Sequence, residues 1–128
     1  SLLDGNFPYL VAEADDAVVG YAYAALYRSR PAYRFSVEDS VYVDPKAQRH
    51  GIGRILLDRL VVESEKRGFR QMIAVIGDSV QTASIELHRA CGFEMIGTIK
   101  NVGFKFERWL DTVLMQRALG DGARTKPT

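Results

Sequence analysis

The strongest constraint on the fold is a strand, a basic loop with two glycines and a long amphipathic helix, all within residues 38–67. The helix is predicted over residues 52–67, because apolar side chains recur there at the spacing of one helical face: Ile52, Ile55, Leu56 and Leu60. A continuous apolar run at residues 72–76 is typical of a strand that is buried on both faces. A strand, a helix and a second strand in this order predict two neighbouring parallel strands joined by the helix.

Shorter segments with β character lie on both sides of this unit. Further strands are predicted at residues 9–13, 18–26, 93–99 and 109–119, and a second helix at residues 82–91. A chain of 128 residues has the size of one domain. The sequence therefore predicts a single α/β (α+β) domain over residues 1–119. Residues 120–128, which are rich in glycine and charged residues, are predicted to form a flexible tail.

Charge and composition exclude several classes of protein. The formal net charge is +1, so no basic surface for a nucleic acid is expected. No apolar run reaches the roughly 18 residues of a membrane span, and no signal-peptide pattern opens the sequence. Cys91 is the single cysteine, which excludes an internal disulfide and is compatible with a reducing compartment. We expect a cytoplasmic protein that binds neither nucleic acid nor membrane.

The loop before the long helix has the features of a phosphate-binding site. Helix N-termini carry unpaired N–H groups and a partial positive charge, and Gly51 and Gly53 leave these groups open to phosphate oxygens. Arg49, His50 and Arg54 add basic side chains. The Walker loop needs Gly-Lys-Ser/Thr and the dinucleotide fingerprint needs three glycines, and this loop has neither. Two glycines alone also fit a structural turn.

The string Gln48-Arg49-His50-Gly51-Ile52-Gly53 resembles the Q/R-x-x-G-x-G/A pyrophosphate loop of the GNAT acetyltransferases. Three further segments resemble the phosphinothricin and methionine sulfoximine acetyltransferase group of that family: residues 33–43, 74–93 and 103–116. The resemblance implies the GNAT fold, a central mixed and mostly antiparallel sheet with a splayed parallel strand pair and flanking helices. The strand and two helices with which this family usually begins are not found, so an N-terminally short form or a fragment is expected.

The resemblance implies acetyl-CoA as cosubstrate and no metal, since the thioester is already activated. Acetyl-CoA would lie between the splayed strands at residues 38–43 and 72–76. The residues that the resemblance assigns to it are Val41, Tyr42, Val43, Gln48, Arg49, His50, Gly51, Ile52, Gly53, Arg54, Gln81 and Ser84. Gln81 stands where the family commonly has asparagine, so the contact made there is expected to differ.

The resemblance also implies two catalytic residues. Glu38 matches the glutamate that this group is thought to use as general base, to take a proton from an ammonium with a pKa of about 8. His88, in the Ser-x-x-x-His pattern of residues 84–88, could act as acid, or as base through water. From the residues alone, Glu38 also fits a solvated strand edge and His88 a structural helix position. Which of the two is the main base stays open. Cys91 is assigned to packing rather than to an acetyl-cysteine intermediate.

Arginines close to Glu38 suit a small acceptor with an anionic end, because guanidinium groups bind carboxylates and phosphinates in bidentate geometry. The residues assigned to the acceptor are Arg28, Arg30, Tyr33, Arg34 and Lys105, although a solvated basic loop is an equal interpretation of the first four. Trp109, in the same K-x-x-x-W-x-D string as Lys105, is assigned to the core rather than to the pocket wall.

The expected function is N-acetylation of a small amino-acid-like molecule of the phosphinothricin or methionine sulfoximine/sulfone type. A homodimer is expected, since members of the group commonly form one. Three alternatives stay open: an acetyltransferase for a protein N-terminus or a polyamine, a catalytically inactive acyl-CoA-binding domain, and a nucleotide-phosphate-binding module.

Overall fold

The computed structural model describes residues 6–48, 50–78 and 82–127. Its strands are β1 (Tyr9–Ala14), β2 (Ala17–Leu26), β3 (Ser36–Val43), β4 (Gln71–Ile76), β5 (Glu94–Lys105) and β6 (Arg108–Ala118). Its helices are α1 (Ile52–Lys66) and α2 (Thr82–Ala90), with 3-10 turns at Pro31–Tyr33 and Pro45–Ala47. The predicted strands and helices are present, and the largest difference is β5, which continues to Lys105 instead of ending at residue 99. The first of these turns begins at Pro31, because proline suits the first position of a helical turn.

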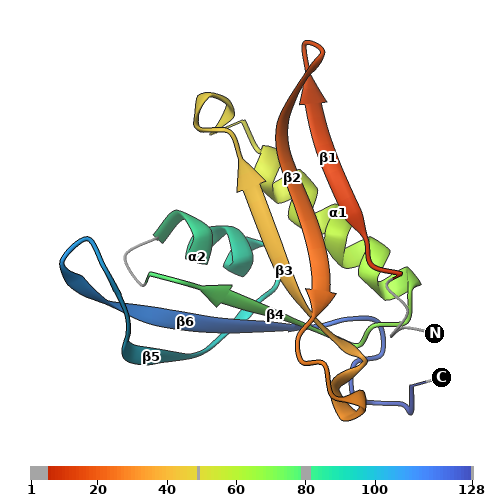
Figure 1. The fold of residues 1–128 in the computed structure, drawn as a ribbon. Helices are drawn as coiled ribbons and strands as arrows, with labels where there is room; N and C mark the ends of the chain where they lie inside the picture. The colour runs from red at the N-terminus through yellow and green to blue at the C-terminus, as the bar shows by residue number, and fades with distance from the viewer. Residues whose placement is uncertain (1–5, 49, 79–81, 128) are drawn as a thin grey trace.

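The strands form one sheet in the order β1-β2-β3-β4-β6-β5. β3 and β4 are the parallel pair, and the other neighbours are antiparallel. The parallel pairing joins Ser36–Glu38 to Gln71–Ile73 and then stops. The two strands diverge from there, so that the sheet opens into a V with β1–β3 on one arm and β4, β6 and β5 on the other (Figure 1). The mixed, mostly antiparallel sheet and the splayed parallel pair predicted from the sequence are confirmed.

The two helices cover different arms of the sheet. α1 packs against β1, β2 and β3, and α2 packs against β4 and β5 (Figure 1). The predicted apolar face of α1 needs one correction, because Ile55 is exposed while Leu57 and Val61 are buried beside Leu56 and Leu60. No helix in the described ranges is long and apolar enough to cross a membrane.

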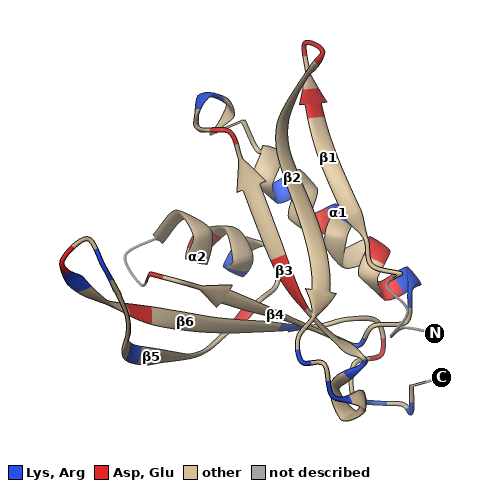
Figure 2. Ribbon diagram, in the orientation of Figure 1, with Lys and Arg blue, Asp and Glu red and all other residues tan. Residues whose placement is uncertain are grey.

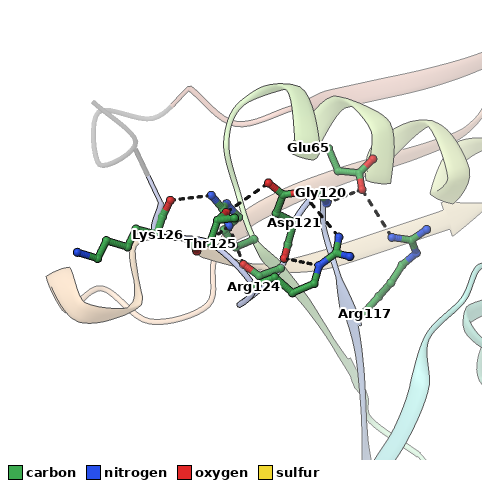
Figure 3. Close-up of polar contacts among 9 residues, drawn as sticks. Glu65, Arg117, Gly120, Asp121, Arg124, Thr125 and Lys126 are labelled. Carbon is green, nitrogen blue, oxygen red and sulfur yellow. Dashed lines mark hydrogen bonds and ion pairs between the residues drawn. The ribbon is translucent and has the colours of Figure 1, made fainter.

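The segment after β6 is held against α1 and the start of β4 (Figure 3). The guanidinium of Arg70 donates hydrogen bonds to the carbonyl oxygens of Gly122 at 2.7 Å, Thr125 at 3.1 Å and Lys126 at 3.0 Å. The N–H of Gly120 donates to the Glu65 carboxylate at 2.7 Å. These contacts identify Arg70 as an anchor of this segment. The flexibility expected of residues 120–128 stays a prediction.

Arg70→Ala is expected to lower the free energy of unfolding by on the order of 1–2 kcal/mol, because charge-assisted hydrogen bonds to three carbonyl oxygens are lost. Amide exchange in residues 120–126 is expected to become faster, and hydrogen-exchange mass spectrometry would measure it. The matched control is Arg124→Ala, because the Arg124 Nε donates only within the segment, to the carbonyl oxygen of Asp121 at 3.2 Å. Equal exchange in the two variants would contradict the anchoring role of Arg70.

Candidate active site

The gap between β3 and β4 contains a cavity of about 240 Å³. Its walls come from β3, the end of β4 and α2, through Glu38, Asp39, Ser40, Val41, Ala74, Val75, Ile76, Gly77, Ser84 and His88. Because the parallel strands stop pairing after Glu38 and Ile73, the facing edges beyond that point present N–H and C=O groups that an extended ligand can pair with. The cavity therefore combines titratable side chains with backbone groups that suit a chain-like cosubstrate.

Glu38 lies at the point where the two strands part. Successive side chains of a strand point to opposite faces, so Glu38 faces away from α2 and is half-buried, whereas Asp39 faces α2 and is buried. Burial raises the pKa of the Glu38 carboxyl, and the charge of Asp39 raises it further, while the Arg28 guanidinium acts in the opposite direction. Glu38 is therefore a stronger base than an ordinary glutamate, and it lies within electrostatic reach of Arg28.

His88 faces Asp39 across the cavity wall. Its Nε2 lies 2.7 Å from Oδ2 of Asp39, and its Nδ1 lies 2.8 Å from the carbonyl oxygen of Ser84 in the preceding helical turn. The ring also packs edge-on against Phe93, with 4.9 Å between the ring centroids. Burial alone would lower the pKa of His88, but the hydrogen bond and the charge of Asp39, with the Ser84 carbonyl, raise it above the ordinary value.

Asp39 is the residue of this site that reasoning from the sequence missed. A signal for it was present, because Val37, Asp39, Val41 and Val43 alternate along β3 and three of these four side chains are apolar. An acidic residue in the core-facing register of a strand needs a partner, since a lone buried charge is costly. His88, already assigned to the site, is that partner.

The loop before α1 follows β3, the strand that lines the cavity. Gly51 has a φ of 76°, a conformation that favours glycine, and the N–H of Ile55 donates to its carbonyl oxygen at 3.1 Å as the first bond of the helix. The Gln48 side chain donates to the carbonyl oxygen of Val43 at 3.3 Å, and Arg54 pairs with Asp58 at 3.1 Å. The loop thus joins the cavity strand directly to the helix N-terminus.

The other residues assigned to the cosubstrate lie along the same path. Val41 and Ser84 line the cavity, while Val43, Ile52 and Gly53 are half-buried where β3 and α1 meet, and Tyr42 and His50 are exposed. Arg49 and Gln81 lie outside the described residues.

Residues 27–34, between β2 and β3, contain three arginines, and we call them the arginine loop. This loop forms a separate pocket of about 350 Å³, lined by Tyr27, Arg28, Ser29, Arg30 and Tyr33. Figure 2 shows basic residues gathered on the loop between β2 and β3, below the acidic stretch of β3. Arg34 turns back on its own loop, donating to the Pro31 carbonyl oxygen at 2.7 Å. The predicted acceptor residues of this loop are therefore grouped on the side of the cavity where Glu38 lies.

Lys105 and Trp109 lie near the tip of the β5–β6 hairpin, which extends away from the arginine loop (Figure 1). The Lys105 ammonium lies 5.1 Å from the ring centroid of Phe106. The assignment of Trp109 to the core is wrong, because its side chain is 63% exposed and contacts the ring of Phe104 edge-on. The structure therefore does not bring Lys105 together with the other predicted acceptor residues.

Cys91 is buried against the core, as its assignment to packing requires. Burial raises the pKa of its thiol to about 12, and the neighbouring Asp58 carboxylate adds to the effect. Because the thiolate is the nucleophile, a pKa this high argues against Cys91 as a nucleophile at neutral pH. Among the residues that the structure describes, no cluster of three or more histidine, cysteine or acidic side chains is arranged to hold a metal ion.

Comparisons with known proteins agree with this architecture. The model of the "Acetyltransferase (GNAT) family" matches residues 2–93. A phosphinothricin N-acetyltransferase of Alcaligenes faecalis is 56% identical over 126 residues, which are 98% of this chain and 64% of that protein. An L-methionine sulfoximine/L-methionine sulfone acetyltransferase of Salmonella typhimurium is 44% identical over 92% of this chain and 68% of its own length.

A solved structure also resembles this fold closely. The crystal structure of a phosphinothricin acetyltransferase from Sinorhizobium meliloti in complex with AcCoA superposes with a TM-score of 0.92 at 57% identity, covering 95% of this chain and 66% of that one. The chain thus spans about two thirds of the length of these relatives. By the family model, the sequence identity and the V-shaped sheet, this chain belongs to the GNAT acetyltransferase family.

Proposed function

We propose that this chain carries the active site of an acetyl-CoA-dependent N-acetyltransferase for small amino-acid-like molecules, of the phosphinothricin or methionine sulfoximine/sulfone type. The observation that carries the proposal is the cavity between the diverging strands β3 and β4, with Glu38 in its wall. The names of the similar proteins support the substrate class, since they act on phosphinothricin and on methionine sulfoximine or sulfone.

In the proposed reaction Glu38 is the general base. Its raised pKa strengthens it as a base, while an ordinary α-amino group near pKa 8 needs to lose a proton before it can attack. The ammonium gives its first proton to solvent, the neutral amine forms the new C–N bond at the thioester carbonyl, Glu38 takes the second proton from that nitrogen, and the C–S bond breaks to release the CoA thiolate. The backbone of Val41 and Val43 and the N–H groups at the start of α1 hold the arm and the pyrophosphate of acetyl-CoA.

The arginine loop is proposed to bind the anionic end of the acceptor. Arg28 and Arg30 line the same pocket, and Arg28 acts electrostatically on Glu38. A carboxylate or phosphinate bound there would place the α-amino group towards the base.

The test is thiol release from acetyl-CoA with phosphinothricin, L-methionine sulfoximine, common amino acids and spermidine as acceptors. We expect turnover with the first two, and we expect Arg28→Gln to raise the KM for these acceptors without a similar effect on acetyl-CoA. Turnover restricted to spermidine or to a peptide amine would favour the alternative acceptors. Binding of acetyl-CoA without turnover on any acceptor would overturn the proposal in favour of an acyl-CoA-binding domain.

We further propose a homodimer located in the cytoplasm. Apolar side chains are exposed along β5 and its hairpin, at Met95, Ile96, Ile99, Val102 and Phe104, and would be buried in an interface between two copies. Sedimentation equilibrium would test the dimer.

The location in the cytoplasm is supported by the single cysteine, Cys91, whose buried thiol is compatible with the reducing interior of a cell.

A further inference from the structure

The buried pair of Asp39 and His88 occupies both nitrogens of the imidazole ring. The Ser84 carbonyl oxygen can only accept, so the Nδ1 atom that lies 2.8 Å from it must carry a proton. The Nε2 atom lies 2.7 Å from a carboxylate oxygen of Asp39. The side chains of His88 and Asp39 are only 5% and 2% exposed, so their contact is shielded from bulk solvent. His88 therefore has no ring nitrogen left with which to exchange a proton with a substrate.

The proton shared between His88 and Asp39 belongs on the histidine. An ordinary imidazole is a much stronger base than an ordinary carboxylate, and the hydrogen bond and charge of Asp39 outweigh the opposing effect of burial on the pKa of His88. With the proton on Nε2 the pair is an imidazolium beside a carboxylate, a dipole whose positive end is the His88 ring. The groups that act on His88 are Asp39 from β3 and the Ser84 carbonyl from α2, while Glu38 on the other face of β3 is coupled to Asp39.

Asp39 is costly as a mere core residue. Its second carboxylate oxygen, Oδ1, is buried and has no hydrogen-bond partner in the part of the chain that the structure describes. Leaving a buried acceptor unpaired costs on the order of 1–3 kcal/mol, so a residue selected for stability alone would not leave it so. Asp39 and His88 both line the cavity in the strand gap. The unpaired acceptor of Asp39 therefore lies in the wall of the cavity that also contains Glu38.

We propose that Asp39 is a positioning residue for acetyl transfer: it holds His88 as an imidazolium with both N–H groups occupied, so that His88 acts through its positive charge at the cavity wall. The inference rests on the proposed function and adds separate roles for Glu38 and His88. Glu38 takes the amine proton, and the imidazolium stabilises the negative charge that develops as the C–S bond breaks and the thiolate leaves with its electron pair. No proton leaves His88 in this step.

Asp39→Asn separates charge from structure. The asparagine amide can donate to a bare Nε2, so the variant keeps both hydrogen bonds to the ring while it favours a neutral imidazole with its proton on Nδ1. We expect ¹⁵N NMR at pH 7 to show an imidazolium signal for His88 in the parent protein and a neutral ring in Asp39→Asn. We expect kcat to fall on the order of 10²-fold while the KM for acetyl-CoA changes little. The chain has two histidines, so a His50→Gln background leaves His88 as the single NMR signal.

The matched control is Glu86→Gln on the same helix, which removes one negative charge from an exposed pair with Arg89. We expect this variant to keep the His88 signal and kcat of the parent. A neutral His88 in the parent at pH 7 would overturn the proposal, and so would a folded Asp39→Asn that keeps the parent kcat. The NMR signal of the parent needs neither turnover nor a folded variant, so it decides the state of His88 even if the proposed activity is not found.

Discussion

Glu38→Gln is expected to reduce kcat by about 10²- to 10⁴-fold, the usual contribution of a positioned general base. The change keeps the shape of the side chain and removes its ability to accept the amine proton. Acetyl-CoA should bind with nearly unchanged affinity, because the residues assigned to it lie further along β3 and at the start of α1. Steady-state thiol release gives kcat and KM, and isothermal titration calorimetry gives the affinity for acetyl-CoA.

The pH dependence of the proposed activity in the parent protein provides a second readout of Glu38. A base is active in its deprotonated form, so kcat/KM rises with pH through the pKa of the free base. Because burial and the Asp39 charge raise this pKa, we expect the acidic limb of the profile to lie above the ordinary glutamate value of 4.5. The Glu38→Gln variant should lose that limb. If this variant instead keeps the rate and pH profile of the parent, the base is another residue.

Gly20→Val is expected to have the largest effect on stability among the glycine substitutions. A Cβ atom at Gly20 would lie 2.8 Å from the carbonyl oxygen of Tyr42 and 3.2 Å from Cδ1 of Leu56. Backbone on one side and helix α1 on the other leave no space for the side chain. We expect the free energy of unfolding to fall by on the order of 3 kcal/mol, as for overpacked cores, and urea denaturation would measure it.

The same substitution should weaken acetyl-CoA binding. Ile52, the first residue of α1, lies 3.5 Å from the position of the added Cβ, so displacing the helix moves the N–H groups proposed to hold the pyrophosphate. Gly97→Val is the matched control, because a Cβ at Gly97 meets no atom within 4 Å. Equal stability of the two variants would show that α1 can shift without cost.

The order of strands and helices could be predicted because each depends on neighbours in the sequence. The apolar run of β4 and the spacing of Leu56 and Leu60 in α1 are local patterns. Gly68 has a φ of 88°, as a helix C-terminal cap requires. The strand–helix–strand order also predicted the parallel pair, and the family resemblance added that its two strands are splayed.

The site was only partly predictable. Glu38 and His88 were assigned by resemblance, and the structure places both in one cavity. Asp39 was missed because its importance depends on a partner 49 residues away. The core assignment of Trp109 failed for a related reason, because an aromatic side chain at the end of a hairpin is buried only if another element covers it.

The sequence by itself determined the secondary structure and the position of the glycine loop, since backbone propensity and hydrophobic spacing act over a few residues. Only the tertiary structure decided that β3 and β4 separate after Glu38 and that a buried carboxylate and imidazole meet across the gap. It also decided which side of α1 faces the sheet, with Leu57 buried and Ile55 exposed. These outcomes depend on packing between segments distant in the chain, and packing is a property of the whole fold rather than of any local pattern.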